Sequence, residues 1–233
     1  MLEIQSTIER RLYEKGASLV GFADLSELRA EVPHSLTYGI SIAVALNQSV
    51  VARIVRGPTR EYLEEYRRVN GLLNNLAAYA ASTLEENGYK AYAIKSTVSS
   101  IDKELPETLR TPLPHKTVAT RAGFGWIGKN ALLVTKQYGS AVRLASVLTD
   151  AELDTGCPAN ESRCGDCTEC VDVCPVHAPS GRKWNVTLDR DDFFNADACY
   201  RKAKQFADEN GFDATICGMC IAVCPWTRKS KYT

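Results

Sequence analysis

Apolar residues in the first 150 positions alternate between helical and strand spacing. Residues 2–15 carry Ile4, Ile8 and Leu12 at intervals of four, which predicts an amphipathic helix that Gly16 ends. Residues 38–46 (YGISIAVAL) are uncharged and rich in β-branched side chains, so we expect a buried strand. Shorter apolar runs predict further strands at 17–22 and 89–94.

A long helix is predicted after Gly57-Pro58. Thr59 is a suitable N-cap, Glu61 suits the positive end of the helix dipole, and Asn87-Gly88 is a suitable stop. One face of this helix is apolar at a 3-4 spacing, through Tyr62, Tyr66, Val69, Leu73, Leu76 and Ala80. The polar, proline-bearing stretch 97–114 then predicts a loop suited to cover a ligand.

The segment after this loop predicts a helix at 115–123 and strands at 131–135 and 141–149, with the two strands joined as a hairpin through Tyr138-Gly139. A hairpin beside helix-linked strands favours an α+β fold over a doubly wound parallel sheet.

Between the predicted helix and hairpin lies a glycine-rich stretch, GFGWIGKN. Its glycines permit close backbone approach, and three interpretations follow: a turn packed by Trp126, a dinucleotide fingerprint, or a loop that faces a cofactor. The last of these is our prediction, with these binding residues: Gly123, Gly125, Trp126, Gly128, Lys129 and Asn130.

Charge and hydropathy narrow the classes of partner. Lys plus Arg and Asp plus Glu number 28 each, so the balance argues against a large nucleic-acid surface. No apolar run reaches membrane-spanning length, and no apolar stretch follows Arg10-Arg11 as an export signal requires. We therefore expect a cytoplasmic protein that does not engage a membrane, in a compartment where thiols serve metal sites more often than disulfides.

All nine cysteines lie at or after residue 157, and eight of them form the strongest pattern in the chain. The first run has the C-x2-C-x2-C-x3-C-P spacing of bacterial 4Fe-4S ferredoxins, and the second has C-x2-C-x3-C-P. In such runs the cysteine before the proline reaches the neighbouring cluster. We predict one cluster on Cys164, Cys167, Cys170 and Cys224, and another on Cys174, Cys199, Cys217 and Cys220.

The cysteine pattern leaves alternatives open. Four thiolates also suit zinc, although zinc requires neither the third cysteine nor the two Cys-Pro pairs. Cys157 lies outside both runs and is either a spare thiol or a replacement for Cys199. Because every cysteine lies in the last third of the chain, we predict two domains. Residues 1–150 would bind a cofactor or substrate, and residues 151–233 would form a ferredoxin-like two-cluster module.

The stretch 119–150 (ATRAGFGWIGKNALLVTKQYGSAVRLASVLTD) resembles the epoxyqueuosine reductase family. The double cysteine module, which ends in Cys224-Pro225-Trp226, resembles it too, and Glu65-Tyr66-Arg67 is weakly similar to the family's Asp-Tyr-His stretch. The family is related to reductive dehalogenases. The resemblance implies a nitroreductase-like cobalamin domain, two 4Fe-4S clusters that deliver electrons to cobalt, and a glycine loop beside the corrin.

Three departures from the family concern the substrate. The family's tRNA-modifying members carry a catalytic aspartate in a segment that here reads 109–116 (LRTPLPHK), without an acid. The chain stops soon after the last cysteine, and its charge is balanced. From these features we expect a short paralogue with a different substrate, and not tRNA as a partner.

The missing acid directs attention to other proton donors. His115 has a suitable pKa and Tyr66 a phenol, although the structural explanations, a capping or surface histidine and a core tyrosine, are favoured for both. Lys116, like Lys129, is suited to bind an acidic group of cobalamin or substrate.

The sequence thus predicts an iron-sulfur oxidoreductase of the epoxyqueuosine reductase type. A reduced ferredoxin or flavodoxin would supply electrons, and the substrate would be a small molecule or the corrinoid itself. The alternatives are a ferredoxin-like electron carrier whose N-terminal domain docks a partner, an FMN enzyme, and a sensor of redox state or iron.

Overall fold

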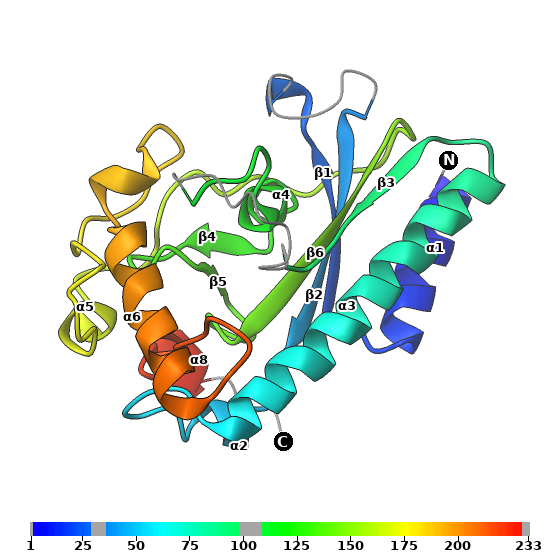
Figure 1. The fold of residues 1–233 in the computed structure, drawn as a ribbon. Helices are drawn as coiled ribbons and strands as arrows, with labels where there is room; N and C mark the ends of the chain where they lie inside the picture. Colours follow the sequence, from blue (N-terminus) through cyan, green and yellow to red (C-terminus); the bar gives the residue numbers. More distant parts are fainter. Residues whose placement is uncertain (1, 29–35, 98–108, 230–233) are drawn as a thin grey trace. The chain divides into compact units, whose positions relative to one another are not determined.

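A computed structural model describes residues 2–28, 36–97 and 109–229, and its elements are shown in Figure 1. Contacts divide the chain into two compact units. Unit 1 comprises Met1–Ala45, Val69–Phe124 and Arg143–Ala159, and unit 2 comprises Leu46–Arg68, Gly125–Val142 and Asn160–Thr233. This division is discontinuous and differs from the single boundary at residue 150 that the cysteine distribution suggests, because segments distant in sequence pack into the same unit.

Unit 1 is built on a four-stranded sheet in the order β1-β2-β6-β3. Its strands are β1 (Leu19–Asp24), β2 (Tyr38–Ala45), β3 (Ala91–Ile94) and β6 (Val142–Thr149). The β1–β2 and β3–β6 pairs are antiparallel. A mixed fold of helices and antiparallel strands is therefore confirmed.

Helices cover both faces of this sheet. Helix α1 (Leu2–Glu14) and the part of α3 (Arg60–Glu86) that belongs to unit 1 lie on one face, and α4 (His115–Arg121) lies on the other (Figure 1). A short 3-10 turn, η1 (Ser26–Leu28), follows β1. The predicted capping of α3 is present, because the Thr59 hydroxyl accepts a hydrogen bond from the Tyr62 amide at 3.2 Å.

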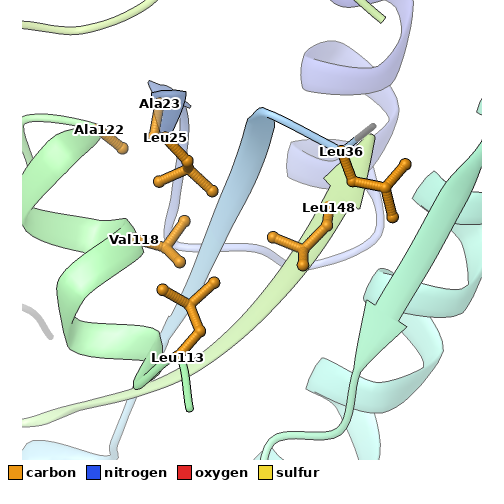
Figure 2. Packing of buried hydrophobic residues seen from close by; sticks show 7 residues of the cluster. All are labelled: Ala23, Leu25, Leu36, Leu113, Val118, Ala122 and Leu148. Carbon is orange, nitrogen blue, oxygen red and sulfur yellow. The ribbon is translucent and has the colours of Figure 1, made fainter. Parts of the chain in front are cut away.

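The core between α4 and the sheet is apolar. Figure 2 shows seven of its buried side chains: Ala23, Leu25, Leu36, Leu113, Val118, Ala122 and Leu148. Gly39 of β2 is required beneath α4, since a Cβ there would lie 3.0 Å from a Val118 methyl group and 2.9 Å from one of Leu25. The predicted ligand-covering loop falls mostly at 98–108, outside the described residues.

Unit 2 contains a small hairpin and short helices. The hairpin pairs β4 (Gly125–Ile127) with β5 (Leu133–Thr135). The helical pieces are α2 (Gln48–Val51), the start of α3, α5 (Glu169–Asp172), η2 (Arg190–Asp192), α6 (Ala196–Asn210), α7 (Met219–Ala222) and α8 (Pro225–Lys229). No helix in the described part of the chain is both long and apolar enough to cross a membrane.

The predicted hairpin between 131–135 and 141–149 is wrong. β5 pairs with β4 inside unit 2, whereas β6 joins the sheet of unit 1. The reason is the glycine-rich stretch, which we expected to be a loop and which forms the strand β4. Gly125 permits this pairing, since a Cβ there would lie 2.0 Å from the Val134 carbonyl oxygen.

Candidate iron-sulfur centre

Four cysteines line one cavity of about 280 Å³ within unit 2. They are Cys164, Cys167, Cys170 and Cys224, and their companions in the wall include Lys129, Asn130 and Trp226. Helix α5 carries Cys170 and contacts α7, which ends two residues before Cys224. The structure therefore brings the last cysteine of the second run to the three leading cysteines of the first.

The remaining four cysteines form a second group. Burial raises the pKa of Cys199, and the nearby thiols of Cys217 and Cys174 raise it further. Burial also raises the pKa of Cys220, with contributions from Cys217, Cys199 and Cys174 and from Cys170 of the first group. Cys199 lies in the first turn of α6, where the Asn195 side chain caps the helix by accepting from the Ala198 amide at 2.9 Å. Cys157 is exposed, belongs to unit 1 and lines neither group.

Burial raises the pKa of four of these thiols, those of Cys170, Cys199, Cys217 and Cys220. Burial, together with the nearby Cys164, Cys224 and Cys167, raises the pKa of Cys170 to about 12. Burial and the neighbouring thiols raise the pKa of Cys199 to about 11. Because only thiolates ligate iron, these groups favour an occupant whose positive charge displaces their protons.

The size of the first cavity bears on the choice between zinc and a cluster. Among the described residues, no three Cys, His, Asp or Glu side chains gather closely enough for a single metal ion. The four thiols are instead spread around a space of about 280 Å³, which has room for a multinuclear cluster. The donor set and the cavity both fit 4Fe-4S ligation.

The glycine-rich stretch packs against the cysteine segments. Gly139, in the turn after β5, is close to the Trp226 and Thr227 backbone, where a Cβ would lie 2.2 Å from the Thr227 nitrogen. Trp126 and Trp226 meet edge to face, with ring centroids 5.0 Å apart. The buried indole N–H of Trp126 has no hydrogen-bond partner among the described residues.

The residues predicted to bind a cofactor are divided between the two units. Lys116 and Gly123 belong to unit 1, whereas Gly125, Trp126, Gly128, Lys129 and Asn130 belong to unit 2. Trp126, Lys129 and Asn130 are at most 5% exposed. Their side chains face the interior of unit 2, and their assignment to an organic cofactor stays a prediction.

His115 is held by hydrogen bonds on both ring nitrogens. Nδ1 lies 2.9 Å from the Ser146 hydroxyl, and Nε2 lies 2.9 Å from the Lys95 carbonyl oxygen, to which it donates. Burial lowers the pKa of His115, and Arg143 lowers it further, against a raising effect of the Lys95 carbonyl. These contacts give His115 a structural task between α4 and β6; its catalytic role stays a prediction.

The predicted tyrosine donor is only half buried. Tyr66 lies in the first part of α3 in unit 2, beside Glu65. Glu65 is buried, accepts from the Asn47 amide at 2.8 Å and pairs with Arg68 at 2.7 Å. Neighbouring Tyr62 packs beneath the cysteine loop, against Gly218. At the place of the family's Asp-Tyr-His stretch, this chain thus carries an acid, Glu65, whose contacts are structural.

Sequence reasoning overlooked one feature of the cavity. Lys129 donates a hydrogen bond from Nζ to the Cys167 carbonyl oxygen at 2.8 Å. Its position beside three closely spaced glycines suggested contact with an organic cofactor. No sequence signal connects residue 129 to a cysteine 38 positions later, because tertiary packing alone brings them together.

Comparisons with known proteins agree with this geometry. The 4Fe-4S double cluster binding domain family matches residues 163–227. Epoxyqueuosine reductase of Cyclobacterium marinum is 33% identical over 130 residues, which cover 52% of this chain and 39% of the relative. The chain spans about half or less of the length of the curated relatives that it matches.

The fold is shared with solved structures, among them the following two. An epoxyqueuosine reductase in complex with an epoxyqueuosine-modified tRNA stem loop has a TM-score of 0.61 at 19% identity, covering 100% of this chain and 67% of that chain. A reductive dehalogenase, whose structure suggests a mechanism for B12-dependent dehalogenation, has a TM-score of 0.69 at 16% identity. The match covers 95% of this chain and 32% of that chain.

These comparisons correct one expectation. We argued against tRNA as a partner, partly from the balanced charge, yet a protein of the same fold is solved with a tRNA stem loop. Net charge is a poor guide here, because a small local surface suffices for contact with a stem loop. The resemblance to the epoxyqueuosine reductase family is confirmed, and residues 163–227 match the 4Fe-4S double cluster binding domain.

Proposed function

We propose that this chain is an iron-sulfur oxidoreductase that uses two 4Fe-4S clusters to supply electrons for a reductive reaction on an electrophilic substrate. The observation that carries the proposal is the cavity of unit 2, where thiols from two separate runs converge. The family match over 163–227 and the similarity to epoxyqueuosine reductases support the same chemistry.

The ligands follow from the two groups of cysteines. Cys164, Cys167, Cys170 and Cys224 hold one cluster, while Cys174, Cys199, Cys217 and Cys220 hold the other. When bound, such clusters accept and donate single electrons. The protein's own part is to hold the thiols at fixed positions and to exclude water, and the Ala178 amide donates to the Cys174 sulfur at 3.3 Å.

We further propose that a corrinoid accepts the electrons. It would bind in a nitroreductase-like domain formed around the sheet of unit 1. Its support is the sequence resemblance and the fold shared with a B12-dependent dehalogenase. The assignment of Trp126, Lys129 and Asn130 to a corrin stays a prediction, since these side chains are buried in unit 2. We therefore derive no chemical step through that group.

The substrate class is an electrophile whose reduction consumes electrons in pairs. The relatives' name indicates epoxyqueuosine, and a tRNA stem loop that carries it is the first substrate to test. That the substrate differs from epoxyqueuosine stays a prediction from the acid-free segment 109–116.

The decisive experiment is anaerobic purification followed by analysis of iron, cobalt and flavin. About eight iron atoms per chain are expected for two clusters, with one cobalt when cobalamin is bound. About eight irons without cobalt after incubation with cobalamin would favour an electron carrier, and bound flavin would favour an FMN enzyme. Zinc in place of iron would refute the proposal.

A further inference from the structure

The side chain of Lys129 is a buried cation at the cluster cavity. It is 5% exposed, lines the cavity with the four cysteines, and donates to the Cys167 carbonyl oxygen at 2.8 Å. Among the residues that the structure describes, this is its one hydrogen bond, and no carboxylate pairs with it. Two of its three ammonium donors therefore remain available to whatever occupies the cavity.

A buried ammonium without a counter-charge is costly. Removing an unpaired charge from water destabilises a protein by several kcal/mol unless another charge or strong acceptor compensates. The thiols that share the cavity with Lys129 are those of Cys164, Cys167, Cys170 and Cys224, which become anionic when they ligate metal. Two further cations, Arg163 and Lys229, also line the cavity, but both are exposed. The thiolates that hold the occupant of the cavity are therefore the counter-charge that this buried lysine lacks.

The backbone around Lys129 keeps the ammonium in place. The Gly128 amide donates to the Leu132 carbonyl at 2.8 Å, and the Ala131 amide donates to the Gly128 carbonyl at 2.9 Å. Next to it, the buried Asn130 amide group donates to the Ser140 hydroxyl at 3.1 Å. Both sequence neighbours of Lys129 are thus held by hydrogen bonds, and the bond to the Cys167 carbonyl oxygen fixes the ammonium itself.

The second group of cysteines has a weaker cation. Lys202 influences Cys217 from α6, but its Nζ lies 4.3 Å from the Phe206 ring centroid and 3.1 Å from the Gln205 side-chain oxygen. Lys202 is also only half buried, so water screens its charge more than that of Lys129.

We infer that Lys129 raises the reduction potential of the cluster held by Cys164, Cys167, Cys170 and Cys224, so that an electron rests preferentially there. The inference depends on the proposed two-cluster function. Reduction adds one electron from an external reductant such as dithionite and breaks no bond. A fixed positive charge in a poorly solvated site stabilises the more negative, reduced form.

The test is a mediated redox titration of the reconstituted full chain, followed by electron paramagnetic resonance. Lys129→Gln removes the charge and keeps a donor for the Cys167 carbonyl, whereas Lys129→Arg keeps the charge. For Lys129→Gln, the reduction equilibrium constant of one cluster should fall about tenfold, which corresponds to ~59 mV for a one-electron couple. Lys129→Arg should stay close to the parent.

Lys229 supplies a matched control, because it lines the same cavity from α8 but is exposed. Lys229→Gln should shift the potential far less than Lys129→Gln. Equal shifts for both variants, or a Lys129→Gln chain with full iron and parental potentials, would overturn the inference. Loss of one cluster from Lys129→Gln but not from Lys129→Arg would support the inference that the Lys129 charge balances the charge of the cluster's thiolates.

Failure of the inference is separable from failure of the proposed function. A parent chain that binds no iron refutes both. A parent with two clusters and an unshifted Lys129→Gln variant refutes the role of Lys129 alone.

Discussion

Unit 1 and unit 2 differ in what their interiors contain. The interior of unit 1 is made of aliphatic side chains between a sheet and its helices, and the half-buried His115 is satisfied there by two hydrogen bonds. Unit 2 has a smaller apolar cluster around Ile127, Ala131 and Phe193, and it also buries the Cys224 thiol and the Lys129 ammonium. We therefore expect unit 1 to fold through hydrophobic burial and unit 2 to need its clusters for full stability.

The largest expected effect is loss of the clusters. Chelation of iron from the anaerobic protein should unfold much of unit 2, because the binding energy of a metal centre contributes directly to folding. Hydrogen exchange should show lost protection in α6 and α7 and retained protection in β2 and β6. Equal loss of protection in both units would contradict this comparison.

The ligand set can be tested in the same way. Cys224→Ser should reduce the iron content from about eight to about four atoms per chain, since Cys224 completes the first cluster. Cys157→Ser is the control and should retain all the iron, because its exposed thiol lies with neither group. A Cys157→Ser variant that loses four irons, with Cys199→Ser unaffected, would show that the last ligand is misassigned.

A core substitution in unit 1 should destabilise the fold without removing iron. Leu25 is fully buried, so Leu25→Ala should lower the free energy of unfolding by about 2–5 kcal/mol in chemical denaturation. The control Val55→Ala changes a side chain that is 62% exposed and should cost less than ~0.5 kcal/mol. Iron loss on Leu25→Ala would argue that the stability of the two units is coupled.

A smaller effect is expected at the anchor of the last cysteine segment. The Thr227 hydroxyl is buried and accepts a hydrogen bond from the Ser140 amide at 3.1 Å. Thr227→Val keeps the shape but leaves that amide unsatisfied, at a cost of about 1–3 kcal/mol. Thr227→Ser, which keeps the hydroxyl, should retain more of the parental stability in the same denaturation experiment.

The smallest effect is the pH dependence that His115 contributes. Burial lowers the folded-state pKa of His115 below its ordinary value of 6.5, so the unfolded chain binds its proton more readily. Its contribution is fully present above pH 6.5 and declines as the pH falls from there toward the lowered pKa. His115→Gln should flatten this part of the stability profile, and an unchanged slope would assign it to other groups.

The sequence predicted most of unit 1. Apolar periodicity located α1, α3 and β2 to within about two residues, since each of these elements buries one continuous face. It failed at residues 123–130, where glycines suggested a loop and the chain forms β4. The strand predicted at 131–135 is present as β5, but it pairs with β4 and not with β6. Glycine is required there because β4 and β5 approach closely, and such a contact cannot be inferred from local composition.

The sequence by itself determined the cysteine chemistry, because ligand spacing of two and three residues reflects local geometry around a cluster. Only the tertiary structure decided how the glycine-rich stretch packs and that Lys129 lies beside Cys167. These features depend on contacts between residues far apart in the chain. Burial then raises the pKa of the thiols of Cys170, Cys199, Cys217 and Cys220, since a low-dielectric interior disfavours the charged thiolate.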